Sequence, residues 1–443
     1  MDLTEIKRRM KEAEVDTIRV DYPDLFGICR SKIAPAVYLE ELFEDGLNFA
    51  KPTFALNLAN DVATGTGCGE EVDWEDFNLK LDPTTFVLMP HQPHVGRFIG
   101  NGFKKGQPFK VDPRWILRNT LKKFEDKGFR PVAASELEFF VFRKDENGNV
   151  TRYCDFPSSV YQVSPRVDEL DLLRTLQNTF IKMDFPIIYL NHEFFQSQYE
   201  VNWRYDHALK VADQTFTFKA VCKEVAHQHG LLLTFMGRPR NDSGGSGYHL
   251  HISLSDPETK RNLFDDPKGQ YGLSDLARWF IAGQVAHARG MAAFFAPTIN
   301  SYKRYRPGSF APINYAWGLD NRTIYIRVPS ERGRPTRLEN RAPCASANPY
   351  LVFAAAFAAG LDGIENKMDP GDPLLGDSYS AEGLVPVPST LEEALDEMEK
   401  DPVITEAIGP AMIKAFTAVK RQEVERFKAW VTDWEFTEYS HHL

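Results

Sequence analysis

Residues 135–142 read Ser-Glu-Leu-Glu-Phe-Phe-Val-Phe, and this run constrains the fold more than any other stretch. A β-strand turns successive side chains to opposite faces, so Glu136 and Glu138 share one face while apolar side chains fill the other. Two neighbouring carboxylates among aromatic rings repel each other and lose hydration unless cations or protons compensate them. An isolated Glu-x-Glu is more simply a solvated pair on an edge strand, but aromatic residues on both faces disfavour that interpretation. The run predicts a buried strand over 131–142 that carries the first half of a metal site.

The composition is typical of a soluble globular protein with more than one hydrophobic core. The chain has 443 residues, 43% hydrophobic and 26% charged, and this length exceeds one typical domain. Its net charge of −10 and the lack of a long basic run argue against nucleic acid as a partner.

The five cysteines show no Cys-x-x-Cys spacing, which predicts reduced thiols. The longest apolar stretch, 350–361, is too short to span a bilayer, and residues 1–16 follow an amphipathic helical pattern. We therefore expect a cytoplasmic protein without a membrane partner.

Glycine and proline predict a domain boundary near residue 105. Four glycines between residues 96 and 106 precede prolines at 108 and 113. Strands and helices follow one another without a regular βαβ rhythm, which predicts an α+β fold with domains over 1–105 and 106–443. Helical periodicity covers 113–127, 168–183, 208–228, 273–291, 349–365 and 408–430, and strand-like runs cover 131–142, 186–190, 231–236, 247–254 and 323–328.

Two further segments carry candidate ligands. Glu193 and Glu200 follow the apolar strand 186–190 and could both turn back toward one cation, although two loop glutamates are more often solvated. After the glycine-rich residues 244–247, the side chains of His249, His251 and Ser253 alternate and share a strand face. A lone histidine is usually structural, but an alternating pair behind a glycine loop favours a ligand site.

The third group consists of arginines, which suit bidentate contact with phosphate and carboxylate groups. A solvated basic face is the simpler alternative, and Glu339 among them could equally be a structural ion-pair partner. Oxygen ligands favour Mg²⁺ or Mn²⁺, and an imidazole ligand shifts the preference toward Mn²⁺. Together with the glutamates, the arginines favour phosphoryl transfer that depends on divalent metal. The residues are Arg304, Arg322, Arg327, Arg332, Arg334, Arg337 and Arg341.

Taken in order, these segments resemble the glutamine synthetase family through nearly the whole chain. One such motif alone would be weak evidence for membership of the family, whereas six motifs in the same order are highly specific for it. The motifs are S-E-L-E-F-F-V-F, N-H-E-(x)6-E, G-S-G-Y-H-L-H-I-S, N-S-Y-K-R-(x)2-P-G, N-R-T-I-Y-I-R-V-P, and R-L-E-N-R-A-P followed by A-N-P-Y-L. The resemblance implies a small N-terminal β-grasp-like domain and a large catalytic domain with a curved antiparallel sheet flanked by helices.

The resemblance also implies the roles of individual residues. Glu138, Glu193 and Glu200 would hold one metal, and Glu136, His249 and Glu339 would hold the second. Arg304 and Arg341 would grip the glutamate substrate, and the backbone of Gly245 would contact its amino group. The nucleotide-side positions would be His251, Ser253, Arg327, Arg334 and Arg337, with Arg322 on the phosphate side.

The implied reaction has two steps. The γ-carboxylate of glutamate attacks the γ-phosphate of ATP to give an acyl phosphate, and an amine then displaces phosphate to form an amide. Two or more Mg²⁺ or Mn²⁺ ions and several arginines suit the charge that builds on the transferred group. The family forms each site between neighbouring subunits, so the resemblance implies a homo-oligomer, a ring-stacked dodecamer.

The chain departs from ammonia-using members at three positions. Phe310 occupies the place of a glutamate that closes over the site and helps to deprotonate ammonium. Ala50 aligns with an aspartate that reaches the neighbouring subunit's ammonium pocket, and Gly244 replaces an asparagine before the substrate-contacting glycine. A pocket without these carboxylates has lost its attraction for a cation and its base.

These departures predict a larger amine with an apolar part as the nucleophile, as in the γ-glutamylamide, γ-glutamylpolyamine and γ-glutamylanilide synthetase branch. An arylamine fits because it is neutral near pH 7, and alkylamines or polyamines remain alternatives. The acidic run 70–76 could hold a distal ammonium, although such runs are usually solvated. The second hypothesis is an ordinary glutamine synthetase in which another acid replaces the lost ones. The third, a catalytically silent relative, is disfavoured because all six predicted metal ligands are present.

Overall fold

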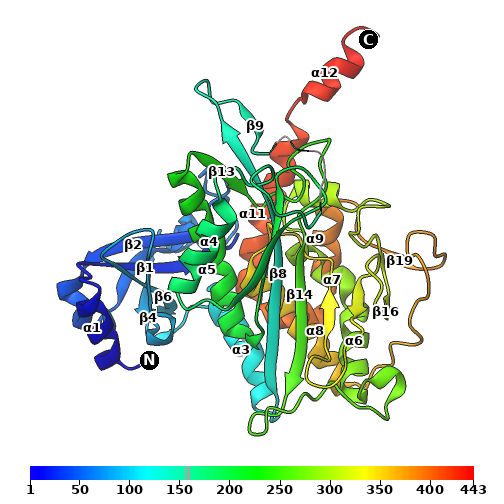
Figure 1. Cartoon of the computed structure of the whole chain (residues 1–443), viewed down its shortest axis with the longest axis horizontal. Helices are drawn as coiled ribbons and strands as arrows, with labels where there is room; N and C mark the ends of the chain where they lie inside the picture. Colours follow the sequence, from blue (N-terminus) through cyan, green and yellow to red (C-terminus); the bar gives the residue numbers. More distant parts are fainter. Residues whose placement is uncertain (155, 157–159) are drawn as a thin grey trace.

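The computed structural model describes residues 1–154, 156 and 160–443. Within these residues it contains a seven-stranded sheet near the N-terminus, a ten-stranded sheet in the remainder and a small two-stranded sheet. Figure 1 shows the N-terminal part, in blue, beside the larger part that holds the long strands β8 (Arg130–Lys144) and β14 (Tyr248–Ser255). The predicted α+β class is confirmed.

The N-terminal sheet has the strand order β2-β1-β6-β4-β3, and β5 and β7 also pair with β6. β1 runs parallel to β6, and β2 and β4 join the sheet antiparallel to their neighbours. The sheet continues through the turn at residue 105 into β7, so its last strand lies just beyond the predicted boundary. Its elements are α1 (Leu3–Glu12), β1 (Thr17–Pro23), β2 (Cys29–Pro35), α2 (Leu39–Glu44), β3 (Leu47–Ala50), β4 (Asp76–Leu81), β5 (Val87–Leu88), β6 (Val95–Lys104) and β7 (Gln107–Pro108).

The glycine-rich stretch that we interpreted as punctuation is the central strand β6. Gly100 faces Leu79 of β4 so closely that a Cβ atom would lie 2.3 Å from Leu79 Cγ. A Cβ atom on Gly102 would lie 3.2 Å from the Cβ of Phe109. Close packing therefore excludes a side chain at Gly100 and leaves little room for one at Gly102, and the interpretation as a break was wrong for residues 95–104.

The large sheet has the order β10-β11-β8-β14-β18-β17-β16. β8 lies inside this sheet between β11 and β14. The short strands β9, β12 and β13 also pair with β8. The strand that carries Glu136 and Glu138 is thus internal, as its aromatic content predicts. The other strands are β9 (Val150–Arg152), β10 (Ile187–His192), β11 (Gln198–Trp203), β12 (Asp206–His207), β13 (Leu231–Thr234), β16 (Trp317–Leu319), β17 (Ile326–Val328) and β18 (Leu338–Asn340), and β15 (Asn314–Tyr315) pairs with β19 (Val385–Pro386).

The two faces of β8 have opposite environments. Leu137, Phe139 and Val141 are fully buried, and the ring of Phe139 lies 6.1 Å from that of Phe218 on helix α5 (Ala208–Gln228). Burying each such side chain stabilises the fold by about 1.5–3 kcal/mol. The opposite face, with Glu136 and Glu138, lines a cavity. Packing against α5 therefore decides which face of the strand presents its carboxylates.

Helices cover the apolar side, with the largely buried α8 at their centre. One predicted helix is divided in two. Residues 273–291 belong to α6 and α7, which meet at His287, whose ring contacts Asp362 and Asp401 at 2.9 and 2.8 Å. The predicted helix over 408–430 is α11, which Gly409 separates from α10 with a φ of 91°.

The helices are α3 (Pro113–Glu125), α4 (Leu172–Lys182), α6 (Asp275–Ala286), α7 (Ala288–Phe295), α8 (Pro349–Glu365), α9 (Leu391–Lys400), α10 (Pro402–Ile408), α11 (Pro410–Lys428) and α12 (Asp433–Tyr439). Within the described residues, none of the helices has both the length and the apolarity needed to cross a bilayer.

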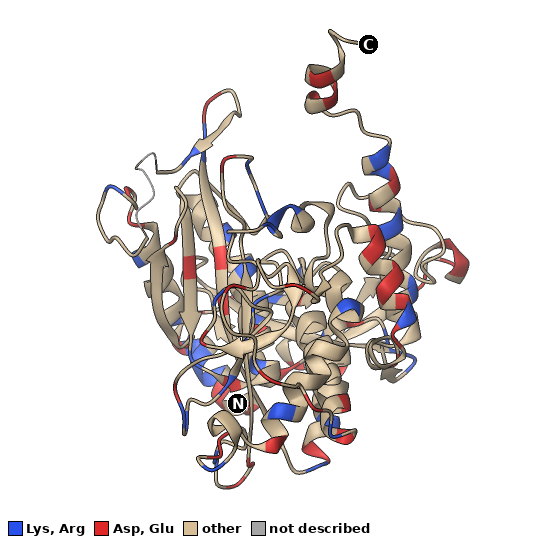
Figure 2. Cartoon of the chain, turned by 90° about the vertical axis from the view of Figure 1, so that its right-hand side faces the viewer, with Lys and Arg blue, Asp and Glu red and all other residues tan. Residues whose placement is uncertain are grey.

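Charged residues on the outside are mixed in sign. Figure 2 shows acidic and basic residues alternating along α11 and interspersed over the same side of the molecule. On α11, Lys428 lies 3.5 Å from Glu425 and 2.9 Å from Glu392 of α9. Such exposed pairs contribute little to stability, so this charge pattern mainly solvates the helix.

Buried ion pairs join the N-terminal sheet to the larger part of the molecule. Arg114 on α3 donates through Nε and Nη2 to the two carboxylate oxygens of Asp213 on α5, each at 2.8 Å. Its Nη1 also lies 2.9 Å from Asp82, which follows β4, and 2.5 Å from the side-chain oxygen of Asn101 on β6. Burial raises the pKa of Asp82, but the Arg114 guanidinium outweighs this and holds that pKa below its usual value. One guanidinium therefore links α3, α5 and the N-terminal sheet.

Candidate active site

A cavity of about 870 Å³ opens on the polar face of β8. The structure brings to it most of the residues that the sequence nominated, although they are spread over the chain from residue 136 to residue 341. Four predicted residues, Ala50, Arg304, Arg332 and Glu339, are not part of its lining. The predicted residues that line it are Glu136, Glu138, Glu193, Glu200, Gly245, His249, His251, Ser253, Phe310, Arg322, Arg327, Arg334, Arg337 and Arg341.

Strand register assembles the core of this site. Glu200 lies opposite Glu138 in the β8–β11 pair, and His249 lies opposite Glu136 in the β8–β14 pair. In the next pair, β14–β18, His251 lies opposite Glu339. Directly opposite residues in an antiparallel pair have close side chains, so three pairings suffice to gather the group. The expectation that Glu200 lies in a loop was wrong, because residues 198–203 form a strand.

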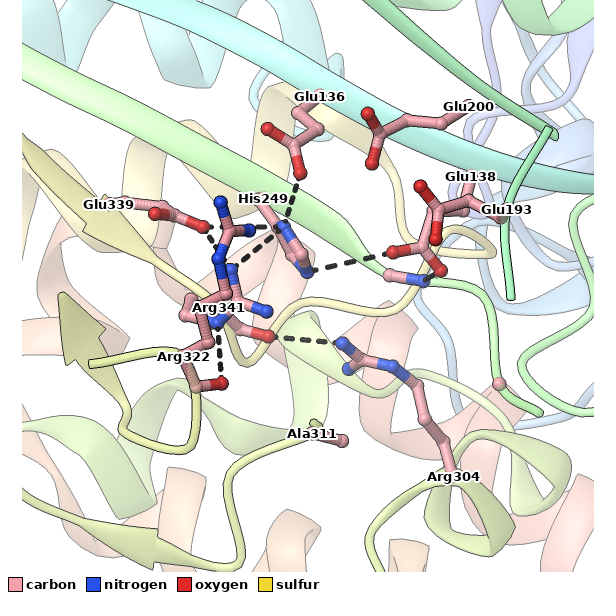
Figure 3. Close-up of polar contacts among 12 residues, drawn as sticks. Glu136, Glu138, Glu193, Glu200, His249, Arg304, Ala311, Arg322, Glu339 and Arg341 are labelled. Atoms are coloured by element: carbon pink, nitrogen blue, oxygen red, sulfur yellow. Dashed lines mark hydrogen bonds and ion pairs between the residues drawn. The ribbon is translucent and has the colours of Figure 1, made fainter. Parts of the chain in front are cut away.

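Glu138, Glu193 and Glu200 form an acidic group on the right of Figure 3. Burial raises the pKa of Glu193 to about 7, and the carboxylate of Glu138 adds to that shift. Burial and the charges of Glu136 and Glu193 raise the pKa of Glu200 well above its usual value. Like charges held together in this way are relieved by a cation, so this group fits a divalent metal with oxygen ligands.

Three amide side chains that the sequence analysis did not nominate orient these carboxylates. Asn191 donates to Glu193 at 2.9 Å. Gln198 donates to Glu138 at 3.0 Å, and Asn202 donates to Glu200 at 2.7 Å. Each amide lies two residues from Glu193 or Glu200 in the sequence, a spacing that is too common to be a signal by itself. On β11 this spacing places Gln198, Glu200 and Asn202 on the same face.

Glu136 and Glu339 have a cationic environment instead. Nδ1 of His249 lies 2.9 Å from Glu136 and 3.4 Å from Glu339, and Nε2 of His251 lies 3.3 Å from Glu136. Burial raises the pKa of Glu136, but the contacts with His249 and His251 have the larger effect and hold that pKa well below its usual value. Burial likewise raises the pKa of Glu339, but Arg341 and His251 lower it to about 2. Both carboxylates are therefore ionised at neutral pH.

These residues fit a second cation. Ligand atoms of Glu136, His251 and Glu339 lie within 4.8 Å of one another. His249, which the family resemblance assigns to this metal, lies between Glu136 and Glu138, with Nε2 3.9 Å from Glu138 (Figure 3). Carboxylates with one imidazole suit Mg²⁺ or Mn²⁺.

Glu339 also has the ion-pair role that the sequence analysis left open. It is fully buried and pairs with Arg341 and, at 2.5 Å, with Nη1 of Arg327. Arg327 in turn contacts Asp320 at 2.6 Å. These contacts hold two arginine side chains at the edge of the cavity.

Further arginines lie on the side of the cavity formed by β14 and the loop before β18. Arg337 donates through Nε to Nδ1 of His251 at 3.1 Å, and Arg334 donates to the hydroxyl of Tyr205 at 2.8 Å. The Arg334 guanidinium also lies 5.9 Å from the centre of the Tyr205 ring. This combination of cations with an aromatic ring suits a phosphorylated ligand that carries a flat group.

Arg304 lies behind the cavity wall. It is buried and donates to the carbonyl of Ala342 at 2.6 Å. It also donates to the carbonyl of Arg341 at 3.0 Å (Figure 3). A Cβ atom on Gly245 would lie 2.4 Å from its Cγ, and one on Gly247 would lie 2.9 Å from its Nη2. Arg304 thus supports both the glycine loop and the Arg341 backbone. Arg341 itself lines the cavity and donates through Nε to the carbonyl of Arg322 at 3.2 Å.

Two residues predicted to shape the amine pocket lie in different places. Phe310 lines the cavity, and its ring lies 5.8 Å from that of Phe194. Ala50 is exposed at the end of β3 in the N-terminal sheet. Within one chain, Phe310 is therefore in position to contact a ligand in this cavity and Ala50 is not.

Comparisons with known proteins agree with this site. A family model described as "Glutamine synthetase, catalytic domain" matches residues 110–439. The glutamine synthetase of Methanosarcina mazei is 36% identical, with 98% of this chain and 97% of that protein covered. That of Thermotoga maritima is also 36% identical, with 99% of each covered. A solved structure described as "Apo GmaS without ligand" matches with a TM-score of 0.87 and 31% identity over 99% of each chain. A second, "GmaS/ADP complex-Conformation 1", matches with a TM-score of 0.87, 30% identity and the same coverage.

The chain therefore belongs to the glutamine synthetase family, and its fold is that of the family. Its chemistry is accordingly ATP-dependent ligation of glutamate, as in a ligase of the glutamine synthetase type. The family uses divalent metal, which agrees with the group of carboxylates and imidazoles in the cavity.

The raised pKa values in the acidic group predict pH-dependent metal binding. Below pH 7, protons occupy Glu193, whose pKa is about 7, and compete with the metal. Because a bound metal needs ionised ligands, we expect Mn²⁺ affinity to fall about tenfold or more between pH 8 and pH 6. Titrations followed by Mn²⁺ electron paramagnetic resonance at both pH values will measure this change. Glu193→Gln removes the titrating group and should flatten the dependence. Equal affinity at pH 6 and pH 8 in the unsubstituted protein would contradict the prediction.

Proposed function

We propose that this enzyme joins the γ-carboxylate of glutamate to an amine larger than ammonia and releases ADP and phosphate. The observation that carries the proposal is Phe310, whose ring lines the cavity against Phe194. Ammonia-using members carry a glutamate at that position. An aromatic ring neither attracts ammonium nor removes its proton, but it can contact the apolar part of a larger amine. The likeness to the GmaS structures supports the same γ-glutamyl-amine ligase branch.

The first step activates glutamate. Its γ-carboxylate attacks the γ-phosphorus of ATP, the bond to the ADP oxygen breaks, and γ-glutamyl phosphate forms. Arg341 and the backbone of Gly245 hold glutamate, and Arg304 positions both. Arg322 faces the transferred phosphoryl group, where its fixed charge stabilises the transition state. The neighbour described with ADP supports nucleotide binding in such a cavity. The proposed nucleotide contacts are His251, Ser253, Arg327, Arg334 and Arg337.

Two or more Mg²⁺ or Mn²⁺ ions complete the proposed site. One set of ligands is Glu138, Glu193 and Glu200, and the other is Glu136, His249 and Glu339. Bound metal neutralises negative charge on the phosphates and on the transferred group. The amides of Asn191, Gln198 and Asn202 fix the carboxylates for this role.

In the second step the amine nitrogen attacks the carbonyl carbon, the bond from that carbon to the phosphate oxygen breaks, and the departing phosphate takes up the proton that the nitrogen loses. An amine that is neutral at pH 7 attacks without first losing a proton, so it needs no carboxylate at position 310. Its apolar part then contacts Phe310. Closing water out of this site preserves the acyl phosphate.

The second candidate is an ordinary glutamine synthetase. The names of the curated relatives from M. mazei and T. maritima favour it. It requires another acid to hold ammonium, and within one chain none of the acids in the run at residues 70–76 lines the cavity. A catalytically silent relative would have no need for the buried ligand set and its amide partners.

We also propose a cytoplasmic homo-oligomer of stacked rings, with domains over 1–105 and 106–443. Ala50 is exposed on the N-terminal sheet. It would contact the amine only from a neighbouring subunit, where its small side chain leaves room.

One assay decides between the candidates. ADP release is followed with glutamate, ATP, Mg²⁺ or Mn²⁺ and a panel of ammonium, ethylamine, aniline and spermidine. We expect kcat/KM for an apolar amine to exceed that for ammonium by roughly tenfold or more. Phe310→Glu should reverse this order by restoring a carboxylate, while Phe310→Leu keeps an apolar side chain and should retain it. If ammonium is the best substrate of the panel, the proposal is contradicted. If none of the amines supports ADP release, a catalytically silent relative is favoured.

A further inference from the structure

The aromatic ring of Phe195 occupies the space above Gly244. A Cβ atom on Gly244 would lie 2.1 Å from Cε2 of Phe195 and 2.3 Å from its Cδ2. No side chain fits there while the ring keeps its place. Gly244 does not have a positive φ, so a side chain at this position is excluded by the ring and not by backbone strain.

Phe195 is one of three phenylalanines at the rim of the cavity. Phe194, Phe195 and Phe310 all line it, yet their side chains are 49%, 39% and 45% exposed. Phe194 and Phe195 come from the loop between β10 and β11, directly after Glu193. Phe310 comes from the loop after Arg304, and its ring contacts that of Phe194. Aromatic rings that lie exposed beside a ligand cavity favour an apolar ligand group.

Charged groups of both signs lie near this rim. Glu193 directly precedes Phe194 in the chain and lines the cavity together with Glu138 and Glu200. Asp242, close to the glycine loop in sequence, is paired with Arg152 at 2.7 Å and with Arg240 at 3.2 Å. The three aromatic rings, and not the charges, therefore indicate the chemistry of the amine, and they favour an apolar ring.

We propose that Gly244 and Phe195 together determine the specificity for the amine. The missing side chain at Gly244 leaves room for the Phe195 ring, and this ring, with those of Phe194 and Phe310, binds the ring of a neutral arylamine. This inference rests on the proposed amine ligase function and adds its substrate class and two specificity residues. The asparagine that the family usually carries at 244 would displace the ring. The exchange of a polar side chain for an aromatic ring therefore converts one wall of the rim from hydrogen-bonding to apolar.

The test is a double-mutant cycle with Gly244→Ala, Phe195→Ala and the combined variant. ADP release is measured with aniline, ethylamine, spermidine and ammonium. We expect each single substitution to lower the ratio of kcat/KM for aniline to that for ammonium by roughly tenfold or more. In the combined variant the alanine at 244 meets no ring, so its loss should equal that of Phe195→Ala alone. A crystal structure of Gly244→Ala should show the Phe195 ring displaced, which gives a readout independent of activity.

The outcomes separate this inference from the function on which it rests. An unchanged aniline ratio in Gly244→Ala would overturn the inference alone, as would losses that multiply in the combined variant. The same holds if spermidine is the best substrate of the unsubstituted enzyme. A preference for ammonium over every amine in the unsubstituted enzyme would overturn the proposed function, and the inference with it.

Discussion

Replacing Glu138 with glutamine should lower ADP release by about 100-fold or more at saturating Mg²⁺ or Mn²⁺, because the charge of a proposed metal ligand is lost. The Glu138 carboxylate accepts from the Gly247 backbone N–H at 2.8 Å and from Gln198 at 3.0 Å. Both of these bonds end on Oε2, so the amide oxygen of a glutamine can keep them while its NH2 group replaces the other carboxylate oxygen. Steady-state ADP release with glutamate and the best amine measures the loss, and Mn²⁺ titration tests whether one metal has been lost.

Glu146→Gln is the matched control for this substitution. Glu146 lies on the same hairpin in the exposed turn between β8 and β9, so the chemical change is identical but far from the carboxylate cluster. We expect its ADP release to remain close to that of the unsubstituted enzyme. Near-normal activity in Glu138→Gln, with metal affinity unchanged, would refute the ligand role.

Arg114→Ala should lower the free energy of unfolding by about 3–5 kcal/mol, since it leaves buried charges without their partner. Arg114 is 1% exposed, and its guanidinium serves both oxygens of Asp213 as well as Asp82. Removing it leaves two carboxylates facing an apolar junction between the helices and the N-terminal sheet. Denaturant unfolding, followed by circular dichroism, measures the change. If the alanine variant does not fold, Arg114→Lys retains one charge without the bidentate contact and should show a smaller loss.

Arg118→Ala provides the comparison on the same helix. Arg118 lies one turn further along α3, is exposed and donates to Asn101 at 2.8 Å. An exposed contact of this kind contributes little, so we expect a change below about 1 kcal/mol. Equal effects of the two substitutions would show that burial of the Arg114 network does not stabilise the junction.

Much of the fold was predictable because its signals are local. The alternation in residues 135–142 identified β8, and the periodicities over 113–127, 208–228 and 349–365 identified α3, α5 and α8 to within a few residues. The failures share one cause. Gly100 of β6 is a glycine because Leu79 on the paired strand β4 leaves no room for a side chain, and this contact is not visible in the local sequence. Likewise β11 was interpreted as a loop because its polar residues face a site instead of solvent.

The candidate site was predictable as a set of residues, and the resemblance to the family assigned their roles. The amides Asn191, Gln198 and Asn202 were missed because an amide two residues from a glutamate is common and carries no signal by itself. Their role became visible only when the carboxylates were seen to be buried together. Phe195 was missed for a related reason, because its neighbour Gly244 is far from it in sequence and joins it only through the loops around the cavity.

The sequence by itself determined that Glu136 and Glu138 share one face of a strand, because alternation is a property of the extended backbone alone. It also determined, through its motifs, the family and the reaction class. Tertiary structure alone decided that this face lines a cavity, and that Glu200, His249 and Glu339 meet the pair there. Register between strands distant in sequence depends on which apolar faces pack against the helices, and a one-residue slip would turn every carboxylate into the core. Tertiary structure also decided that Phe195 lies over Gly244 at the rim, where steric exclusion between distant loops, and not any local pattern, shapes the proposed amine pocket.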